Sequence, residues 1–390
     1  MCSKSYSNVD KLIVIAIVAT TFLPSTMVFH MFRMVLVGAI FFVKSRKINK
    51  IFLVWMYNIG LAAITVLLVE RSLLSSNILH EFVRVLFYIL VVEVCLNTKI
   101  ELRTLYQIAI VVLTIHFIIQ MTQFLGMNVF DSMIVNYYLA GDSNNIHYIQ
   151  AVSSDYAFRS GSIFINPNVY VCYPSLCTGV FLQYYKSKKS TFSLIMVVIA
   201  FFSIILTGSR MGLGTFSMIV MFFIIKETKV NFKLTKGKIF VALLIILVIA
   251  NWGYVSVYLN EMRAFNLEEA YDGSLGTKLS GIKAYLTISN PLYYLTGSLG
   301  SPRCTFAIDM EYGYIFAWYG LIGVYWFVKL LKMLYTNKKS IHSIIAKSTL
   351  ITILLTDIAA SIILNMSVFP FVCVFALTKT REIGERYETH

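Results

Sequence analysis

The residues best suited to chemistry surround a break in one long apolar run. The segment Leu206–Gly212, Leu-Thr-Gly-Ser-Arg-Met-Gly, interrupts a run that otherwise extends from Thr191 to Ile225. That run is too long for one membrane span of about 20 residues, and its glycines suit a tight turn. We therefore expect a hairpin between two spans, with Arg210 at its tip near the membrane surface. An arginine at that depth is costly without a partner, which favours a functional role for Arg210.

The composition explains why this hairpin is expected in a membrane. Hydrophobic residues make up 58% of the 390-residue chain, charged residues make up 13%, and the mean hydropathy is +0.75. Soluble domains have a much lower apolar fraction and about twice as many charges. We therefore expect an all-α polytopic membrane protein, with a single integral membrane domain over residues 1–390. The cysteines show no metal-ligand spacing, and neither a metal nor another cofactor is expected.

The apolar runs predict about 12 transmembrane helices. Basic residues gather in alternate connectors, so the positive-inside rule places both termini in the cytoplasm. The net charge of +14 is therefore a topology signal, and no nucleic-acid partner is expected. Two long loops are expected on the outer side, at about 126–168 and 259–308. The predicted spans are roughly 11–29, 31–43, 51–69, 81–97, 105–125, 169–185, 191–207, 211–226, 238–258, 309–328, 346–365 and 367–379, with Asp357 in the middle of the eleventh.

Arginines and lysines separate on this topology. Most lysines lie in the cytoplasmic connectors, whereas the outer side carries Arg33, Arg71, Arg84, Arg159, Arg210, Arg263 and Arg303. Orientation alone would treat the two residue types alike. A guanidinium offers a fork of donors that matches phosphate bidentately and keeps its charge. An outward cluster of arginines therefore suits a lipid-linked phosphate. The alternative for Arg33, Arg71 and Arg84 is that they extend to the outer headgroups.

Four segments resemble the O-antigen ligase and polymerase superfamily. Each motif is weak alone, and their order and shared outer placement carry the resemblance, which covers roughly residues 155–325. It implies a GT-C-like helical bundle that acts as a glycosyltransferase in the bacterial cytoplasmic (inner) membrane. The segments are Arg159–Asn168 (R-S-G-S-I-F-I-N-P-N), Thr207–Gly212 (T-G-S-R-M-G), Asn290-Pro291-Leu292 with Gly297 and Gly300, and Asp309–Tyr314 followed by Tyr319–Gly323.

Within that superfamily the chain is more similar to the Wzy-type polysaccharide polymerases. The ligases place a histidine near the end of the second outer loop, where this chain has Asp309 and Glu311. The resemblance implies a growing glycan on undecaprenyl diphosphate as donor, a lipid-linked repeat unit as acceptor, and a chain-length regulator as a further partner. An O-antigen ligase is the alternative within the family. A lipid-linked oligosaccharide flippase is the alternative from another class, although the internal repeat typical of transporters is not seen.

The resemblance also implies roles for individual residues. Arg210 and Arg159, with help from Arg303, would offset the charge on the departing diphosphate. Either Asp309 or Glu311 would take the proton of the acceptor hydroxyl, unless both only cap the span that begins there. Asn166 and Asn168 would position substrate or cap the sixth span. Lys278 stands about where many relatives have an arginine, so it keeps the charge but loses the bidentate fork.

Overall fold

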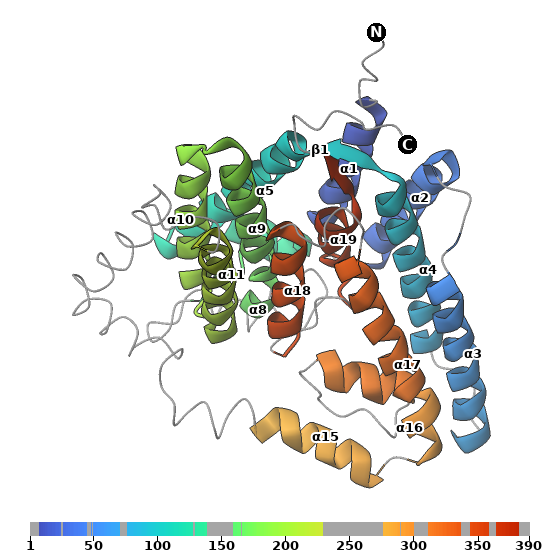
Figure 1. Cartoon of the computed structure of the whole chain (residues 1–390). Coiled ribbons are helices and arrows are strands. Elements are labelled where there is room, and N and C mark those ends of the chain that lie inside the picture. The colour runs from blue at the N-terminus through green and yellow to red at the C-terminus, as the bar shows by residue number, and fades with distance from the viewer. Residues whose placement is uncertain are drawn as a thin grey trace. The chain divides into compact units, whose positions relative to one another are not determined.

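A computed structural model of the chain describes thirteen stretches. They are 8–24, 26–44, 48, 50–70, 76–127, 129–138, 159–164, 166–228, 276–288, 290–299, 311–336, 344–358 and 364–381. Within them the chain is mostly helical (Figure 1). The predicted ninth span at 238–258 lies outside the described residues, as do the central part of the first long loop and much of the second.

The described helices fall into two compact units. The first unit contains α1 (Asn8–Thr21), α2 (Met27–Lys44), α3 (Lys50–Glu70), α4 (Ser76–Asn97), α15 (Gly276–Ile288), α16 (Leu292–Thr296), α17 (Glu311–Thr336) and α19 (Phe369–Leu377). The second contains α5 (Leu102–Phe124), α6 (Asp131–Met133), the π-turn η1 (Ile134–Tyr138), α8 (Pro167–Tyr170), α9 (Cys172–Lys188), α10 (Thr191–Ile205), α11 (Arg210–Thr228) and α18 (Ile344–Thr356). Strands β1 (Lys99–Glu101) and β2 (Lys379–Arg381) pair with each other.

Three helical stretches among the described residues are long and apolar enough to cross a membrane. They are Leu53–Glu70 in α3, Leu102–Phe124 in α5 and Glu311–Tyr335 in α17. Helices α10 and α18 are apolar but shorter. The expectation of a helical protein is therefore confirmed for the described residues, and three of its helical stretches could span a membrane. The total of 12 spans stays a prediction.

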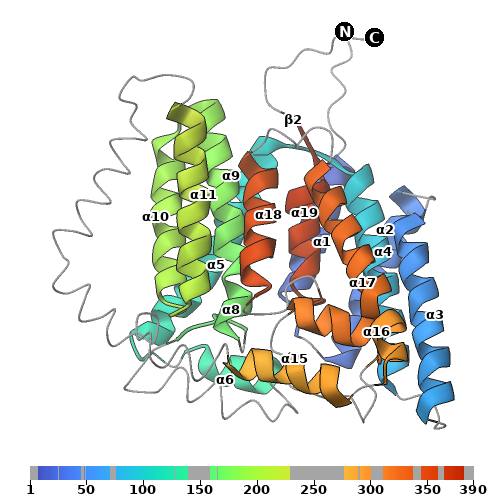
Figure 2. The ribbon, with the colours of Figure 1, turned by 60° about the horizontal axis from the view of Figure 1, so that its bottom comes forward.

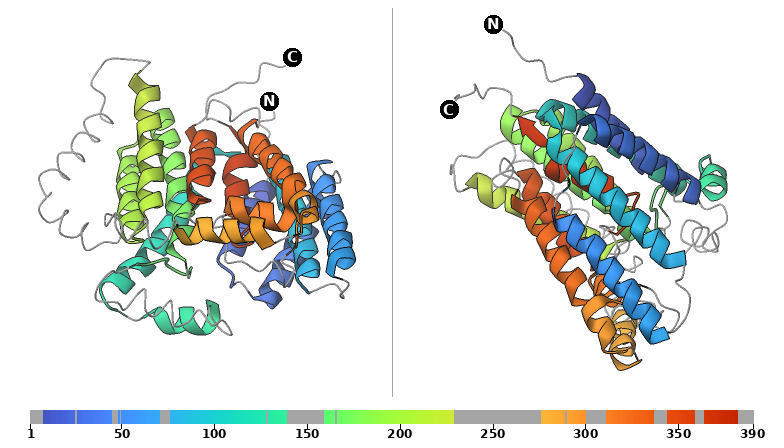
Figure 3. Two further views of the ribbon diagram at one scale, coloured as in Figure 1. Left: turned by 90° about the horizontal axis from the view of Figure 1, so that it is seen from below. Right: turned by 90° about the vertical axis from the view of Figure 1, so that its right-hand side faces the viewer.

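In the first unit the core forms around α4 and α19. Helix α4 packs against α2, α3 and α19, and Figure 3 shows α2, α3 and α4 running beside one another. All nine residues of α19 are buried. A helix that is apolar on every side belongs inside a protein rather than at its surface. This short helix is therefore a core element of the unit.

In the second unit the central element is α9, which packs against α5, α10, α11 and α18 (Figure 2). Gly179 allows the close approach of α18, because a Cβ at Gly179 would lie 2.6 Å from the Cβ of Ser348. Small residues at helix contacts are typical of membrane proteins, where close packing drives association. The unit thus brings α5, α10 and α11 around one helix.

Two predicted boundaries are wrong. The first span was expected to run to residue 29, but α1 ends at Thr21 and α2 begins at Met27. Pro24 lies between them and cannot continue a helix, because it lacks the N–H donor and restricts the residue before it. The eleventh span was expected to reach residue 365, but α18 ends at Thr356. Asp357 therefore follows a helix end instead of lying in mid-span, and its carbonyl accepts the N–H of Glu311 at 3.0 Å.

The span predicted at 309–328 corresponds to α17, which changes direction at Gly320 (Figure 1). Gly320 has φ 64° and ψ −164°, which is not helical. The carbonyls of Ala317 and Trp318 accept N–H groups from Ser298 at 3.0 Å and Leu299 at 3.1 Å. The segment after α16 thus satisfies carbonyls that the broken helix leaves open. Two of the family-like segments, around Gly297 and Gly320, meet at this kink.

Candidate functional site

The expected hairpin is present between α10 and α11. Helix α10 ends at Ile205 and α11 begins at Arg210, with Gly208 between them at φ +59°. Gly208 tolerates this left-handed conformation because it has no Cβ. The hydroxyl of Ser209 accepts the N–H of Gly212 at 3.1 Å, which caps the start of α11. Arg210 is thus the first residue of α11, directly after the turn at whose tip the sequence predicts it.

Arg159 lies against this hairpin. Its Nε donates to the carbonyl of Thr207 at 3.2 Å, and the N–H of Ser160 donates to the carbonyl of Leu206 at 2.9 Å. A Cβ on Gly208 would come within 3.2 Å of the Arg159 Cγ, so the arginine stem crosses the glycine. The absence of a side chain at Gly208 therefore leaves room for Arg159. Two segments identified separately in the sequence meet at one place in the second unit.

The two asparagines have separate local roles. The side chain of Asn166 accepts the N–H of Asn168 at 2.9 Å and caps α8, whose first residue is Pro167. Asn168 Oδ1 accepts from an Nη2 of Arg159 at 3.4 Å. Asn166 therefore acts as the N-terminal cap of α8, while Asn168 contacts Arg159. Both belong to the same local structure as the hairpin.

A buried polar face of α5 also belongs to this site and is absent from the sequence prediction. His116, Gln120 and Gln123 are buried and contact the segment Ser160–Ser162 that follows Arg159. The three residues are spaced i, i+4 and i+7, so they share one face of an otherwise apolar helix. That spacing is the sequence signal that could have revealed them.

Arg33 and Arg84 do not extend to lipid headgroups, because both are enclosed by the first unit. Arg33 is 0% exposed and Arg84 is 6% exposed. Arg33 donates to the carbonyl of Thr20 at 2.9 Å, to His30 Nδ1 at 2.8 Å and to the hydroxyl of Ser367 at 3.0 Å. Both expectations for these two arginines are therefore wrong, because they neither extend to headgroups nor belong to an outward cluster that faces a lipid-linked phosphate.

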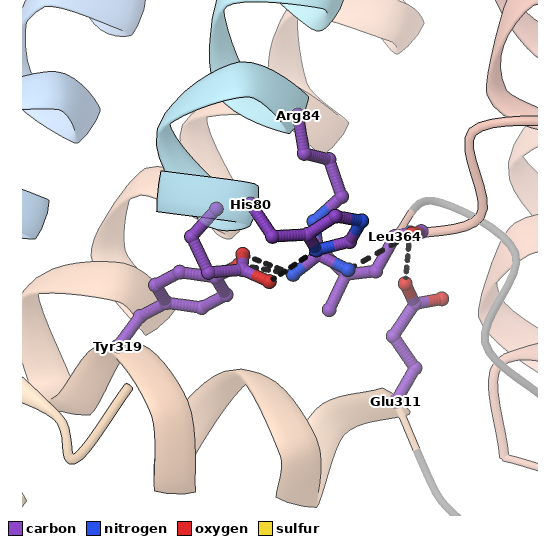
Figure 4. Close-up of polar contacts among 6 residues, drawn as sticks. His80, Arg84, Glu311, Tyr319 and Leu364 are labelled. Atoms are coloured by element: carbon purple, nitrogen blue, oxygen red, sulfur yellow. Dashed lines mark hydrogen bonds and ion pairs between the residues drawn. The ribbon is translucent and has the colours of Figure 1, made fainter. Parts of the chain in front are cut away.

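Arg84 forms a buried network in the first unit (Figure 4). It pairs with the carboxylate of Glu81 and donates to the hydroxyl of Tyr319, which in turn donates to Glu81. Its Nη1 donates to the carbonyl of Leu364 at 3.2 Å. Removing one partner of such a buried pair leaves an uncompensated charge, which costs about 3–5 kcal/mol. Arg84 thus stabilises the interior of the first unit through these buried contacts.

Glu311 stands at the start of α17 and is 0% exposed. Its Oε1 accepts the N–H of Leu364, while its own N–H donates to the carbonyl of Asp357 at 3.0 Å. The carboxylate therefore binds the backbone that leads into α19. Lys278 lies in α15. Asp309 and Arg303 lie outside the described residues, as do Arg71 and Arg263.

The predicted site residues divide between the units. Arg159, Asn166, Asn168 and Arg210 are in the second unit, whereas Glu311 and Lys278 are elements of the first. The structure thus brings together the residues around the hairpin, and it describes Glu311 in a separate local setting.

The geometry around the hairpin suits an anion. Arg159 and Arg210 are both partly exposed. Arg210 is in the first turn of the 19-residue helix α11, whose N-terminus carries a partial positive charge. Helix N-termini and guanidinium groups are the usual protein partners of phosphate oxygens.

Comparison with protein-family models and with curated proteins gives no assignment. No protein-family model matches the chain, and no curated protein matches it. The functional conclusion therefore depends on the motifs and on the geometry of the described residues.

Proposed function

We propose that this protein is a glycosyltransferase that polymerises undecaprenyl-diphosphate-linked repeat units at the outer face of the bacterial cytoplasmic membrane. The observation that carries the proposal is the contact of Arg159 with the Arg210 hairpin. A lipid diphosphate concentrates negative charge, and the guanidinium groups of Arg159 and Arg210, the latter at a helix N-terminus, are suited to hold it. The resemblance of four segments to the O-antigen ligase and polymerase superfamily supports glycosyl transfer as the reaction.

In the proposed reaction, the acceptor hydroxyl oxygen attacks the anomeric carbon of the donor glycan. A new glycosidic bond forms, and the bond from that carbon to the diphosphate oxygen breaks. The lipid diphosphate leaves with the electron pair, so negative charge grows on it in the transition state. Arg159 and Arg210 offset this charge, and the family resemblance assigns Arg303 and Lys278 to substrate binding. Fixed cations are effective here because they need no reorganisation during the reaction.

The acceptor hydroxyl must lose its proton, and we assign this task to Asp309. A general base must reach the substrate directly or through one water. Glu311 is fully buried and accepts a backbone N–H from Leu364. That setting supports a role for Glu311 as an anchor of the backbone near α19. Since at most one of the two carboxylates acts as base, Asp309 is the better candidate.

A matched pair of amides separates these roles. Asp309→Asn should lower polymer formation by about a hundredfold or more, because the base is lost. Glu311→Gln should stay close to the wild type, because the amide oxygen can still accept the N–H of Leu364. The measurement is polymer made per molecule of membrane-inserted protein. The reverse pattern would make Glu311 the base.

The proposed enzyme is a multi-pass protein of the cytoplasmic membrane. About 12 spans in a GT-C-like bundle, with both termini in the cytoplasm, would put the two long loops on the outer side. The substrates are lipid-linked donor and acceptor glycans, and a chain-length regulator is the proposed protein partner. The three apolar helical stretches support membrane insertion.

The products of a deletion strain test the proposed function. A host that lacks this protein should still make and export single repeat units, because flipping is the task of another protein. With a ligase present, these units should appear as a lipid core that carries one repeat and no ladder. The ladder should return when the wild-type chain is supplied.

Other product patterns would identify the alternatives. Long chains that accumulate on undecaprenyl diphosphate would indicate an O-antigen ligase. Unpolymerised units that face the cytoplasm would indicate a flippase. Either result would refute the polymerase, and the two can be separated by extracting the lipid-linked glycans and testing their accessibility from the outer side.

A further inference from the structure

We propose that Gln120 is a positioning residue that sets the placement of Arg159 relative to Arg210. This inference rests on the proposed function, because it concerns the same diphosphate site. Gln120 is in α5, is 0% exposed and does not lie in any of the family-like segments.

The Gln120 amide connects the segment that follows Arg159 with the end of α10 that leads into the Arg210 hairpin. Its Nε2 donates at 3.1 Å to the carbonyl of Ser160 and at 3.1 Å to the carbonyl of Ser203. Ser160 directly follows Arg159, and Ser203 is in the last turn of α10, just before the Arg210 hairpin. The hydroxyl of Ser203 donates back to Gln120 Oε1 at 2.5 Å. One side chain thus binds both segments.

The segment that Gln120 holds has an unfavourable backbone. Ser162 has φ 56°, a left-handed conformation that a non-glycine residue rarely adopts. A Cβ on Gly161 would lie 2.2 Å from the carbonyl oxygen of Phe164, so this turn closes very tightly. Such conformations persist only where the surroundings enforce them, and they concentrate at functional sites. The segment after Arg159 therefore depends on hydrogen bonds from other elements to keep this conformation.

Two neighbours of Gln120 on α5 supply that support. Gln123 donates to the carbonyl of Ser162 at 3.3 Å and accepts from the hydroxyl of Ser160. His116 shares a hydrogen bond of 2.9 Å with the hydroxyl of Ser162. These three contacts stay within the segment after Arg159. Gln120 differs from them because it also reaches α10, so its loss should change how Arg159 meets the hairpin.

Binding of undecaprenyl diphosphate to the full chain in lipid nanodiscs tests the inference. Gln120→Leu keeps the side-chain size but removes both donors. We expect its affinity for undecaprenyl diphosphate to fall about tenfold, the equivalent of one misplaced charged contact. Gln120→Asn keeps the amide but is too short to reach both carbonyls, and it should show a smaller loss. This second variant keeps the test decisive if the leucine variant does not fold.

Ser193→Ala is the matched control. Ser193 also links α10 to α5, through a hydrogen bond of 3.3 Å to the hydroxyl of Tyr106. It is near the opposite end of α10 from the hairpin. Its loss should leave the affinity for undecaprenyl diphosphate unchanged. An equal loss from Ser193→Ala would show that any weakening of the α5–α10 contact suffices, which would overturn the special role of Gln120.

Coupling to Arg159 gives a result that a purely structural role would not produce. If Gln120 acts through Arg159, the double variant with Arg159→Ala should bind no more weakly than Arg159→Ala alone. Independent, additive losses would overturn the positioning role. So would wild-type affinity in both Gln120 variants while Arg159→Ala binds weakly. If instead the wild-type chain does not bind undecaprenyl diphosphate, the proposed function itself fails and the positioning role falls with it.

Discussion

Replacing Arg210 with alanine should abolish polymer formation while the protein still inserts into the membrane. Arg210 is in the first turn of α11, which the Ser209 cap begins, so its positive charge adds to the partial positive charge of the helix N-terminus where the diphosphate would develop negative charge. Loss of one such preorganised group typically costs a factor of about 10²–10³ in rate. Arg210→Lys keeps a point charge but loses the fork, so it should be strongly impaired. The polysaccharide ladder, normalised to membrane-inserted protein, is the measurement.

Arg103→Ala provides the control for charge and expression. Arg103 is exposed in the first turn of α5, and its loss changes the net charge by the same amount. It should give a normal ladder. If Arg210→Ala and Arg210→Lys both make polymer of normal amount and length, Arg210 is only a surface anchor. The proposed diphosphate site would then lose its central residue.

The apolar runs predict several helices closely, because a membrane-spanning helix needs mainly a run of apolar residues of sufficient length. The span predicted at 51–69 corresponds to α3 (Lys50–Glu70), and the span at 211–226 corresponds to α11 (Arg210–Thr228). Hydropathy is insensitive to backbone direction, however. It therefore misses the kink of α17 at Gly320, where every neighbouring residue is apolar or aromatic.

The arginine pair was predictable because each arginine stands inside a recognisable segment with its own glycines. For the remaining polar groups, only partners close in sequence were predictable. Glu81 precedes Arg84 by three residues, so their pairing follows from helix geometry. Tyr319 completes that network from a distant part of the chain, and no local pattern connects the two. The bridge from Gln120 to Ser160 and Ser203 is likewise a product of tertiary packing.

Alanine at Gly320 or at Gly297 should destabilise the first unit severely. A Cβ on Gly320 would lie 2.4 Å from the carbonyl oxygen of Leu295, and one on Gly297 would lie 2.1 Å from the carbonyl oxygen of Trp318. Both contacts are with backbone, which cannot move aside as a side chain can. Both glycines also have positive φ, at +64° and +89°. Overpacking and strain together should cost about 3–5 kcal/mol.

The thermal midpoint of the purified protein in detergent measures this loss, together with the fraction that elutes as folded monodisperse protein. Gly60→Ala is the matched control, because Gly60 is in α3 of the same unit and a Cβ there meets nothing within 4 Å. Alanine favours a helix over glycine by about 1 kcal/mol, so this variant should be as stable as the wild type or slightly more so. A wild-type midpoint for Gly320→Ala and Gly297→Ala would mean that the segment after α16 does not pack into the kink. The two family-like segments that meet there would then owe their glycines to something other than this close backbone contact.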